Sequence, residues 1–347
     1  MKLSKLFILL FSSYGLLNSL NASAVEVKVA ALSAPSHYLN AKQSTSDLIQ
    51  WMEKAHNKGV KILSTPEAFL GGYPLWNYVE KTIDISSGEK HKADFINGAI
   101  DLNGEEVKSI RRAAKKYDVA VVLGANLRGE DGDRNTVFNA IIFIDENGKI
   151  VNVHRKTSGS HTERQYWSYG EASTIKNVLM QGIQVSAVQC WEARNPLTVS
   201  QLALNAPDVV FLPTGDYFNE EYNGLYTVEM RYIGRNVHSY VLSSSIMFNW
   251  DSLDKSDSQL SEEWKKVMPP KAPMAGLGGG AAVDPHGVIL DVTKPFETRL
   301  VTTVVDTNVV KGSLALHSIT DSYRLKGDYT LYVDGKKITG NGVKSIY

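Results

Sequence analysis

The sequence IQVSAVQC at residues 183–190 alternates apolar and polar side chains, which is the pattern of a half-buried β-strand. WEARNPL follows at residues 191–197, a polar turn in which Pro196 stands where a helix can begin. Cys190 therefore lies at a predicted strand-to-helix turn, where a sheet can present a nucleophile at its rim. It is the single cysteine of the chain, so an intrachain disulfide is excluded. From its position alone, Cys190 could equally be a small buried hydrophobic residue, because free cysteines are common in protein cores.

Two further predicted strand ends carry charges of the kind that a cysteine nucleophile needs. The short apolar run at residues 60–67 ends in the carboxylate of Glu67, and a loop rich in turn formers follows. Residues 140–154 predict a β-hairpin with an Asn-Gly turn, and its second strand runs into Lys156. Taken singly, each charge is better explained as a solvated surface residue. Because sites assemble at the carboxyl ends of strands in layered α/β proteins, we expect both to meet Cys190.

Together these side chains fit nucleophilic attack on an electrophilic carbon that is bound to nitrogen. A free thiol has a pKa of about 8.5, so it needs a nearby base or cation to become a thiolate at neutral pH. Glu67 supplies the base, and the ammonium of Lys156 can hold the negative charge that develops on the substrate. The same carboxylate can then pass a proton to the leaving nitrogen and activate water.

The three segments resemble the signature motifs of the nitrilase superfamily, the carbon–nitrogen hydrolases. TPEAF at 65–69, with GYP at 72–74, is similar to the glutamate motif of that family. HRK at 154–156 is similar to its lysine motif, and CWE at 190–192 is similar to its cysteine motif. Order and spacing agree, and Glu163 stands where members usually carry a second glutamate. Residues 278–287 resemble the late strand pair of the same fold, so the similarity spans roughly residues 26–305.

The resemblance implies an α/β fold, a four-layer α-β-β-α sandwich that assembles as a homodimer or higher homo-oligomer. It implies a catalytic triad of Glu67, Lys156 and Cys190, with Glu163 as an orienting carboxylate and with no metal or organic cofactor. The partner would be a small-molecule nitrile or amide. Tryptophan after the cysteine is commoner in the nitrile-hydrolysing branch, so Trp191 favours a nitrilase that makes a carboxylic acid and ammonia. An amidase, or a hydrolase of ureido or carbamoyl amides, is the alternative within the family.

Side chains near the motifs are expected to shape the substrate site. Tyr73, Trp167 and Trp191 predict aromatic pocket walls, and the backbone N–H of Trp191 is a candidate oxyanion donor. We favour His161 as a pocket-wall residue over a general base, because a carboxylate already fits that role. Glu192 is expected to fix the turn through backbone hydrogen bonds.

Some positions depart from the family pattern. Ala193 stands where an asparagine usually follows the cysteine motif, Gly159 stands where a proline is usual, and DSYRLK at 321–326 replaces a late family element. These departures affect loop shape, assembly and substrate choice.

A function from another class is the alternative: a binding or assembly protein that kept the fold and lost the catalytic chemistry. The intact catalytic set of Glu67, Lys156, Glu163 and Cys190 argues against it.

Composition agrees with a soluble enzyme of one domain. The 37 Lys and Arg balance 37 Asp and Glu, and 43% of the residues are hydrophobic, which is enough for a core. There is no basic patch for nucleic acid and no Cys/His cluster with zinc spacing.

No Pro- or Ser-rich linker divides residues 25–347, so we expect one domain there. Within it, the tail from about residue 311 is a candidate assembly arm, and residues 249–271 are expected to form a polar surface loop. Expected helices lie at 46–58, 104–117, 197–204 and 222–237, and expected strands at 26–32, 119–124, 209–212 and 240–243.

The first 24 residues have the layout of a secretory signal. Lys2 and Lys5 precede an apolar run that reaches about Leu20, and Ala22-Ser23-Ala24 is a small-x-small cleavage site. The run is too short and interrupted for a membrane span, which needs about 20 apolar residues. A first core helix is the weaker interpretation, because the strand at 26–32 starts at once. We therefore expect cleavage after Ala24, export to the periplasm or medium, and no stable membrane association afterwards.

Overall fold

The computed structural model describes residues 24–78, 85–130, 133, 135–215, 223–248, 253, 255–267, 278–317 and 332–337. The predicted signal segment, except Ala24, and the late motif at 321–326 lie outside these residues. No helix within the described ranges is long and apolar enough to cross a membrane.

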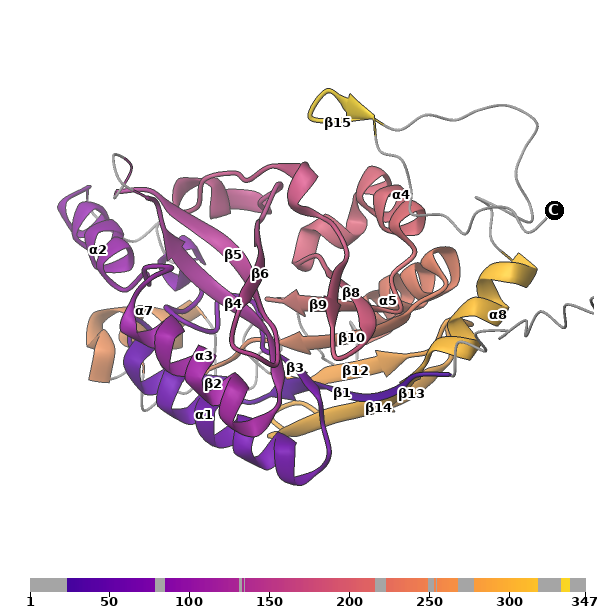
Figure 1. The fold of residues 1–347 in the computed structure, drawn as a ribbon. Coiled ribbons are helices and arrows are strands. Elements are labelled where there is room, and N and C mark those ends of the chain that lie inside the picture. Colours follow the sequence, from indigo (N-terminus) through magenta and orange to yellow (C-terminus); the bar gives the residue numbers. More distant parts are fainter. Residues whose placement is uncertain are drawn as a thin grey trace, which may run out of the picture.

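Two six-stranded sheets form the centre of the molecule (Figure 1). The first has the order β14 (Arg299–Asp306), β1 (Glu26–Ser33), β3 (Ile62–Ser64), β4 (Ala120–Arg128), β5 (Val137–Ile144), β6 (Ile150–Arg155). The second has the order β13 (Ile289–Val292), β12 (Gly280–Val283), β10 (Tyr240–Ser245), β9 (Val209–Thr214), β8 (Ile183–Ala187), β7 (Val178–Met180). Neighbours β1, β3 and β4 run parallel, as do β8, β9 and β10, so the strands of each set end at one edge of their sheet.

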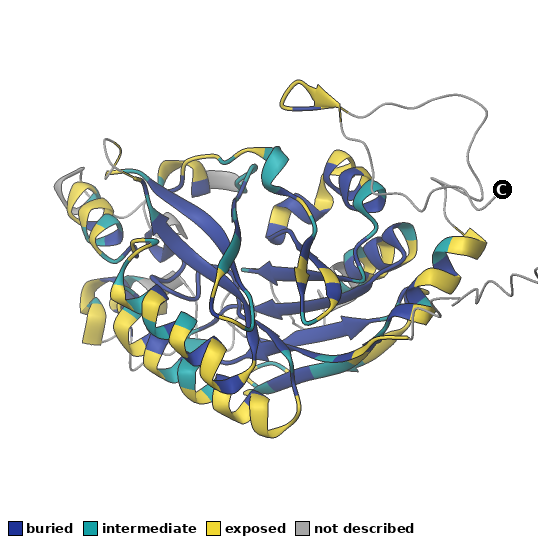
Figure 2. Ribbon diagram, in the orientation of Figure 1, coloured by how far each residue is buried: buried dark blue, intermediate teal, exposed yellow. Residues whose placement is uncertain are grey.

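Helices cover the outer face of each sheet, which gives the expected four layers. α1 (Ala41–Asn57) and α3 (Glu105–Tyr117) pack on the first sheet, and α4 (Pro196–Asn205) and α5 (Asn223–Val237) on the second. A separate apolar cluster, with Val29, Ile141, Val185 and Phe211 among its members, fills the space between the sheets. Figure 2 shows the consequence: the strands of the two sheets are mostly buried, and many of the exposed residues lie on the outward faces of the helices. Strands covered on both faces are near-continuous apolar runs rather than alternating ones.

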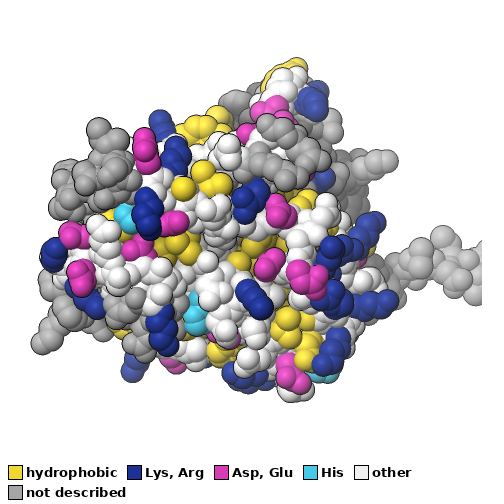
Figure 3. Space-filling model, turned by 90° about the vertical axis from the view of Figure 1, so that its left-hand side faces the viewer, with side chains coloured by type: hydrophobic (Ala, Val, Ile, Leu, Met, Phe, Trp, Pro, Cys, Tyr) yellow, Lys and Arg dark blue, Asp and Glu magenta, His cyan; other side chains and the backbone are white. Residues whose placement is uncertain are grey.

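Further elements connect the strands and helices of the four layers. They are β2 (Pro35–Ser36), η1 (Leu75–Tyr78), α2 (Ile85–Asn97), η3 (His161–Gln165), η4 (Ala172–Thr174), η5 (Cys190–Arg194), β11 (Met247–Phe248) and α7 (Ser258–Val267). α8 (Thr307–His317) follows the first sheet, and a small hairpin joins β15 (Tyr332–Val333) to β16 (Lys336–Lys337). On the face drawn in Figure 3, acidic and basic side chains are interspersed.

The predicted helices and strands are confirmed, with shifted ends. α1 begins five residues before the predicted 46–58, because the Asn40 side chain accepts a hydrogen bond from the Gln43 N–H at 3.1 Å and caps the helix there. The interpretation of 249–271 as a polar loop was wrong for residues 258–267. These form α7, whose Leu260 and Ser261 are fully buried although most of its side chains are polar.

Candidate active site

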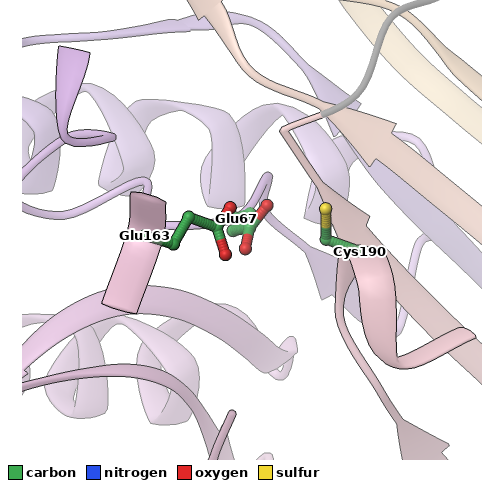
Figure 4. A group of neighbouring side chains, drawn as sticks. All are labelled: Glu67, Glu163 and Cys190. Carbon is green, nitrogen blue, oxygen red and sulfur yellow. The ribbon is translucent and has the colours of Figure 1, made fainter. Parts of the chain in front are cut away.

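The ends of three strands bring the predicted catalytic side chains together. Glu67 follows β3, Lys156 follows β6, and Cys190 begins the turn after β8. Exposed fractions are 1%, 3% and 5% for these residues, and 1% for Glu163. Carboxylate oxygens of Glu67 and Glu163 and the sulfur of Cys190 lie within 4.8 Å of one another. In Figure 4 the Glu67 side chain lies between those of Glu163 and Cys190.

The Lys156 ammonium connects the two carboxylates. Its Nζ lies 2.7 Å from Glu67 Oε1 and 2.9 Å from Glu163 Oε2. The hydroxyl of Tyr73 donates to the other oxygen of Glu163. Glu67, Glu163 and Cys190 have the geometry of a cation site, and Lys156 Nζ already provides a positive charge between the two carboxylates.

Burial and mutual charge set the protonation of this group. Burial raises the pKa of Glu67, and the nearby Glu163 adds to that rise, while Lys156 and Asn139 oppose it. Burial lowers the pKa of Lys156, but Glu67, Cys190 and Glu163 outweigh burial, so this pKa lies well above its ordinary value. Lys156 is therefore a permanent cation, and Glu67 is a carboxyl that can exchange a proton nearer to neutral pH than an exposed one.

The turn at Cys190 has the backbone shape of a nucleophile elbow. Cys190 has φ +50°, a left-handed conformation that non-glycine residues rarely adopt. Its surroundings hold that conformation: Glu192 is fully buried, and its carboxylate accepts hydrogen bonds from the Gln189 N–H at 2.9 Å and the Thr157 N–H at 2.7 Å. The expectation that Glu192 fixes the turn through backbone hydrogen bonds is confirmed.

Glu192 also joins the cysteine turn to the strand that carries the lysine. His154 on β6 lies with its Nε2 3.0 Å from Glu192 Oε2, and its Nδ1 is 2.7 Å from the hydroxyl oxygen of Thr174. Burial alone would raise the pKa of Glu192, but His154 and the hydrogen bonds from Gln189 and Thr157 outweigh burial and hold the pKa at about 2. The carboxylate is thus ionised wherever the protein is folded near neutral pH.

Sequence reasoning missed Asn139, which contacts all three motifs. Its side-chain Nδ2 donates to Glu67 Oε1 at 2.6 Å. Its backbone carbonyl accepts from the Lys156 N–H at 2.7 Å and from the side chain of Gln189, next to the nucleophile, at 3.1 Å. The available signal was a single asparagine in the otherwise apolar run VFNAIIFI at residues 137–144, and the structure shows that this asparagine is fully buried.

The predicted pocket residues have different surroundings. Tyr73 and Trp167 are buried and meet edge to face with their ring centres 5.3 Å apart, and Lys156 Nζ lies 5.6 Å from the Trp167 ring centre. The Trp191 side chain is 37% exposed and lies against the Arg194 guanidinium, at 4.3 Å. The structure thus brings Tyr73 and Trp167 to the lysine and the carboxylates, and places the Trp191 ring at the surface. The side chain of His161 lies outside the described part of the structure.

Comparisons with known proteins agree with this arrangement. The family model described as Carbon-nitrogen hydrolase matches residues 28–312. A bifunctional nitrilase/nitrile hydratase (NIT4B) of Lupinus angustifolius is 23% identical over 270 residues, covering 77% of this chain and 74% of its own. A nitrilase of Meyerozyma guilliermondii is 26% identical over 275 residues, covering 76% and 81%. The crystal structure of Saccharomyces cerevisiae Nit3, a nitrilase superfamily member, superimposes with a TM-score of 0.64 at 17% identity over 86% of this chain and 97% of that one, which shows a shared fold.

Glu192→Gln should lower the free energy of unfolding at pH 7 by about 3 kcal/mol, because the pKa falls from 4.5 to about 2 on folding. The depressed pKa means that this stabilisation is present above pH 4.5 and is lost as the pH falls toward 2. Urea unfolding of both proteins should show the difference shrinking to about half near pH 3. Exposed Glu53→Gln is the control, and an equal difference at both pH values would contradict the assignment.

Asn139→Leu should raise the pKa of Glu67 further, because the lost hydrogen bond favours the carboxylate. The acidic limb of the kcat/KM profile should then move to higher pH, and kcat should fall about tenfold or more. Asn126→Leu is the matched control: this buried asparagine pairs with Asn139 across the strands but bonds Trp167 and Gly72. If both variants lost activity with an unchanged pH profile, Asn139 would be a structural residue alone.

Proposed function

This chain belongs to the carbon–nitrogen hydrolase family, and we propose that within it the protein is a nitrilase, which converts a small nitrile to a carboxylic acid and ammonia. The observation that carries the proposal is the buried Lys156 ammonium between Glu67 and Glu163, beside the Cys190 sulfur. The names of the relatives support a nitrile substrate at identities of 23% and 26%. The solved structures with a similar fold fit any carbon–nitrogen hydrolase and do not distinguish a nitrile substrate from an amide.

The two oxygens of Glu67 have different tasks in this mechanism. Oε1 is held by Lys156 and Asn139. Oε2 is buried and has no hydrogen-bond partner among the described atoms, so it is available to take the thiol proton from Cys190. The left-handed backbone of Cys190 holds the sulfur at this rim. Lys156 stays charged and stabilises negative charge as it grows on the substrate.

The reaction then proceeds in balanced steps. The Cys190 sulfur adds to the nitrile carbon, and the thiol proton reaches the nitrogen through Glu67, which gives a thioimidate. Water adds with Glu67 as base, and the tetrahedral intermediate releases ammonia with a proton from the same carboxyl, which leaves a thioester. A second water releases the acid and restores the thiol. One nitrile and two waters give one acid and one ammonia, and Glu163 orients Lys156 throughout.

Assembly as a homodimer or higher homo-oligomer is part of the proposal. Support comes from α4 and α5, the outer helices of the second sheet. Leu197, Val228 and Tyr232 on these helices are 64%, 57% and 50% exposed. Exposed apolar side chains, of which Val228 and Tyr232 lie one helical turn apart on α5, suit an interface between subunits.

Cys190→Ala should abolish ammonia release while the thermal unfolding transition stays, because no other residue replaces the sulfur. Glu67→Gln should lower kcat at least about 100-fold, the scale of a lost acid–base group. Lys156→Met should do the same, with lower stability because two buried carboxylates lose their cation. Steady-state ammonia assays on folded protein test all three. Substantial turnover by folded Cys190→Ala would refute the covalent mechanism.

Incubation with aliphatic and aryl nitriles should yield acid and ammonia in equal amounts, measured by chromatography and an ammonia assay. Some amide is expected as well, because the tetrahedral intermediate can expel the thiol instead of ammonia. Activity on amides or ureido acids, with none on any nitrile, would assign the chain to the amidase side of the family. The absence of all turnover by folded protein would favour the non-catalytic alternative.

A further inference from the structure

A hollow of about 600 Å³ lies where α5, α8 and the turn between β12 and β13 meet; α5 and α8 are on the same side of the molecule in Figure 1. Two arginines and three histidines are among the described residues that line it: Arg231, Arg235, His238, His286 and His317. No member of the catalytic group is among those described lining residues. Pockets of about 300–1,000 Å³ hold small organic ligands, so this hollow has the size of a ligand site that the proposed reaction does not use.

Contacts between the three elements hold the basic residues together. Arg231 Nε donates to the Gly287 carbonyl at 2.8 Å, and the two terminal nitrogens of this guanidinium carry further donors. The Arg235 side chain lies against the same turn, because a Cβ atom on Gly287 would be 2.9 Å from Arg235 Cγ. His238, which directly follows α5, is 5% exposed, and its Nδ1 lies 2.9 Å from the hydroxyl oxygen of Ser313 on α8. The basic residues of separate elements therefore have fixed relative positions, as a preformed site requires.

The basic groups in the hollow act on one another. Burial lowers the pKa of His238, and the nearby His317 and His286 lower it further, although a backbone hydrogen bond at His317 opposes them. Arg235 also lowers the pKa of His238. Asp284 is an acid in the same turn, and its Oδ1 accepts from the His286 N–H at 2.9 Å. An anion among the basic groups would offset their mutual repulsion, whereas a cation would add to it.

We infer that this hollow binds an organic phosphate, independently of the carbon–nitrogen hydrolase reaction. Arg231 and Arg235 are four residues apart on α5, so they lie on the same face of the helix. Two neighbouring guanidiniums match the two charges of a phosphate monoester, and each can donate a pair of hydrogen bonds to its oxygens. A free phosphate is much smaller than the hollow. Val228 and Tyr232 also line it, and these side chains suit an organic body attached to the phosphate.

Four small molecules test the charge and the organic body of the ligand. Val228 and Tyr232 also belong to the proposed subunit contact, so binding is measured on the protein in the assembly that it forms, by isothermal titration calorimetry in phosphate-free buffer. Phenyl phosphate should bind at least about tenfold more tightly than inorganic phosphate, because its ring buries apolar surface. Phenol lacks the charge and benzyltrimethylammonium carries the opposite charge, so both should bind at least about 100-fold more weakly than phenyl phosphate.

Three results of these titrations would overturn the inference. The first is that neither phosphate binds. The second is that benzyltrimethylammonium or phenol binds as tightly as phenyl phosphate, which would mean that charge does not select the ligand. The third is that inorganic phosphate binds as tightly as phenyl phosphate, which would show a site for the free ion and no recognition of an organic body.

Arg235→Gln tests whether the phosphate binds in this hollow. The variant should bind phenyl phosphate at least about tenfold more weakly, because hydrogen bonds to a charged group are lost. Arg235→Lys keeps the charge without the planar fork and should lose less affinity. Arg112→Gln on α3 is the matched control, since Arg112 is also exposed, and it should leave the affinity unchanged. Thermal unfolding reports whether each variant is folded. An unchanged affinity in folded Arg235→Gln, or an equal loss in Arg112→Gln, would show that the phosphate binds elsewhere.

Discussion

The contact between the Lys156 ammonium and the carboxylates of Glu67 and Glu163 is the constraint on which the site depends. All three groups are almost fully removed from water. A buried charge is tolerated only with close partners and satisfied hydrogen bonds, because otherwise its desolvation is not repaid. Lys156 Nζ lies 2.7 Å from Glu67 Oε1 and 2.9 Å from Glu163 Oε2, so each buried charge has a close partner of opposite sign. Two strand ends and η3 must therefore keep a fixed relative position, and the fold around them is built to do so.

The cysteine turn is fixed from the opposite side by a second buried pair. Glu192 comes two residues after Cys190, and His154 comes two residues before Lys156, so their contact links the two motifs away from the substrate. The hydrogen bonds of Glu192 to the backbone offset the unfavourable left-handed conformation of Cys190. The chain thus uses one ion pair for chemistry and a second buried contact, between His154 and Glu192, to hold the nucleophile.

The sequence was sufficient for the catalytic group because each member follows a recognisable strand, and order along the chain matched a known set of motifs. It was insufficient where a role depends on contacts across the sheets. In the sequence, Asn139 looks like any other polar residue in a strand, and only the structure shows that its side chain donates to Glu67. The Trp191 ring was expected in the pocket, but residue type alone does not determine on which side of the η5 turn a side chain lies.

The raised pKa of Glu67 suits both halves of the proposed reaction. One carboxyl must accept a proton from a thiol and later donate a proton to ammonia, which requires a pKa nearer to neutral than that of an exposed glutamate. Burial and Glu163 raise it, and Lys156 and Asn139 limit the rise.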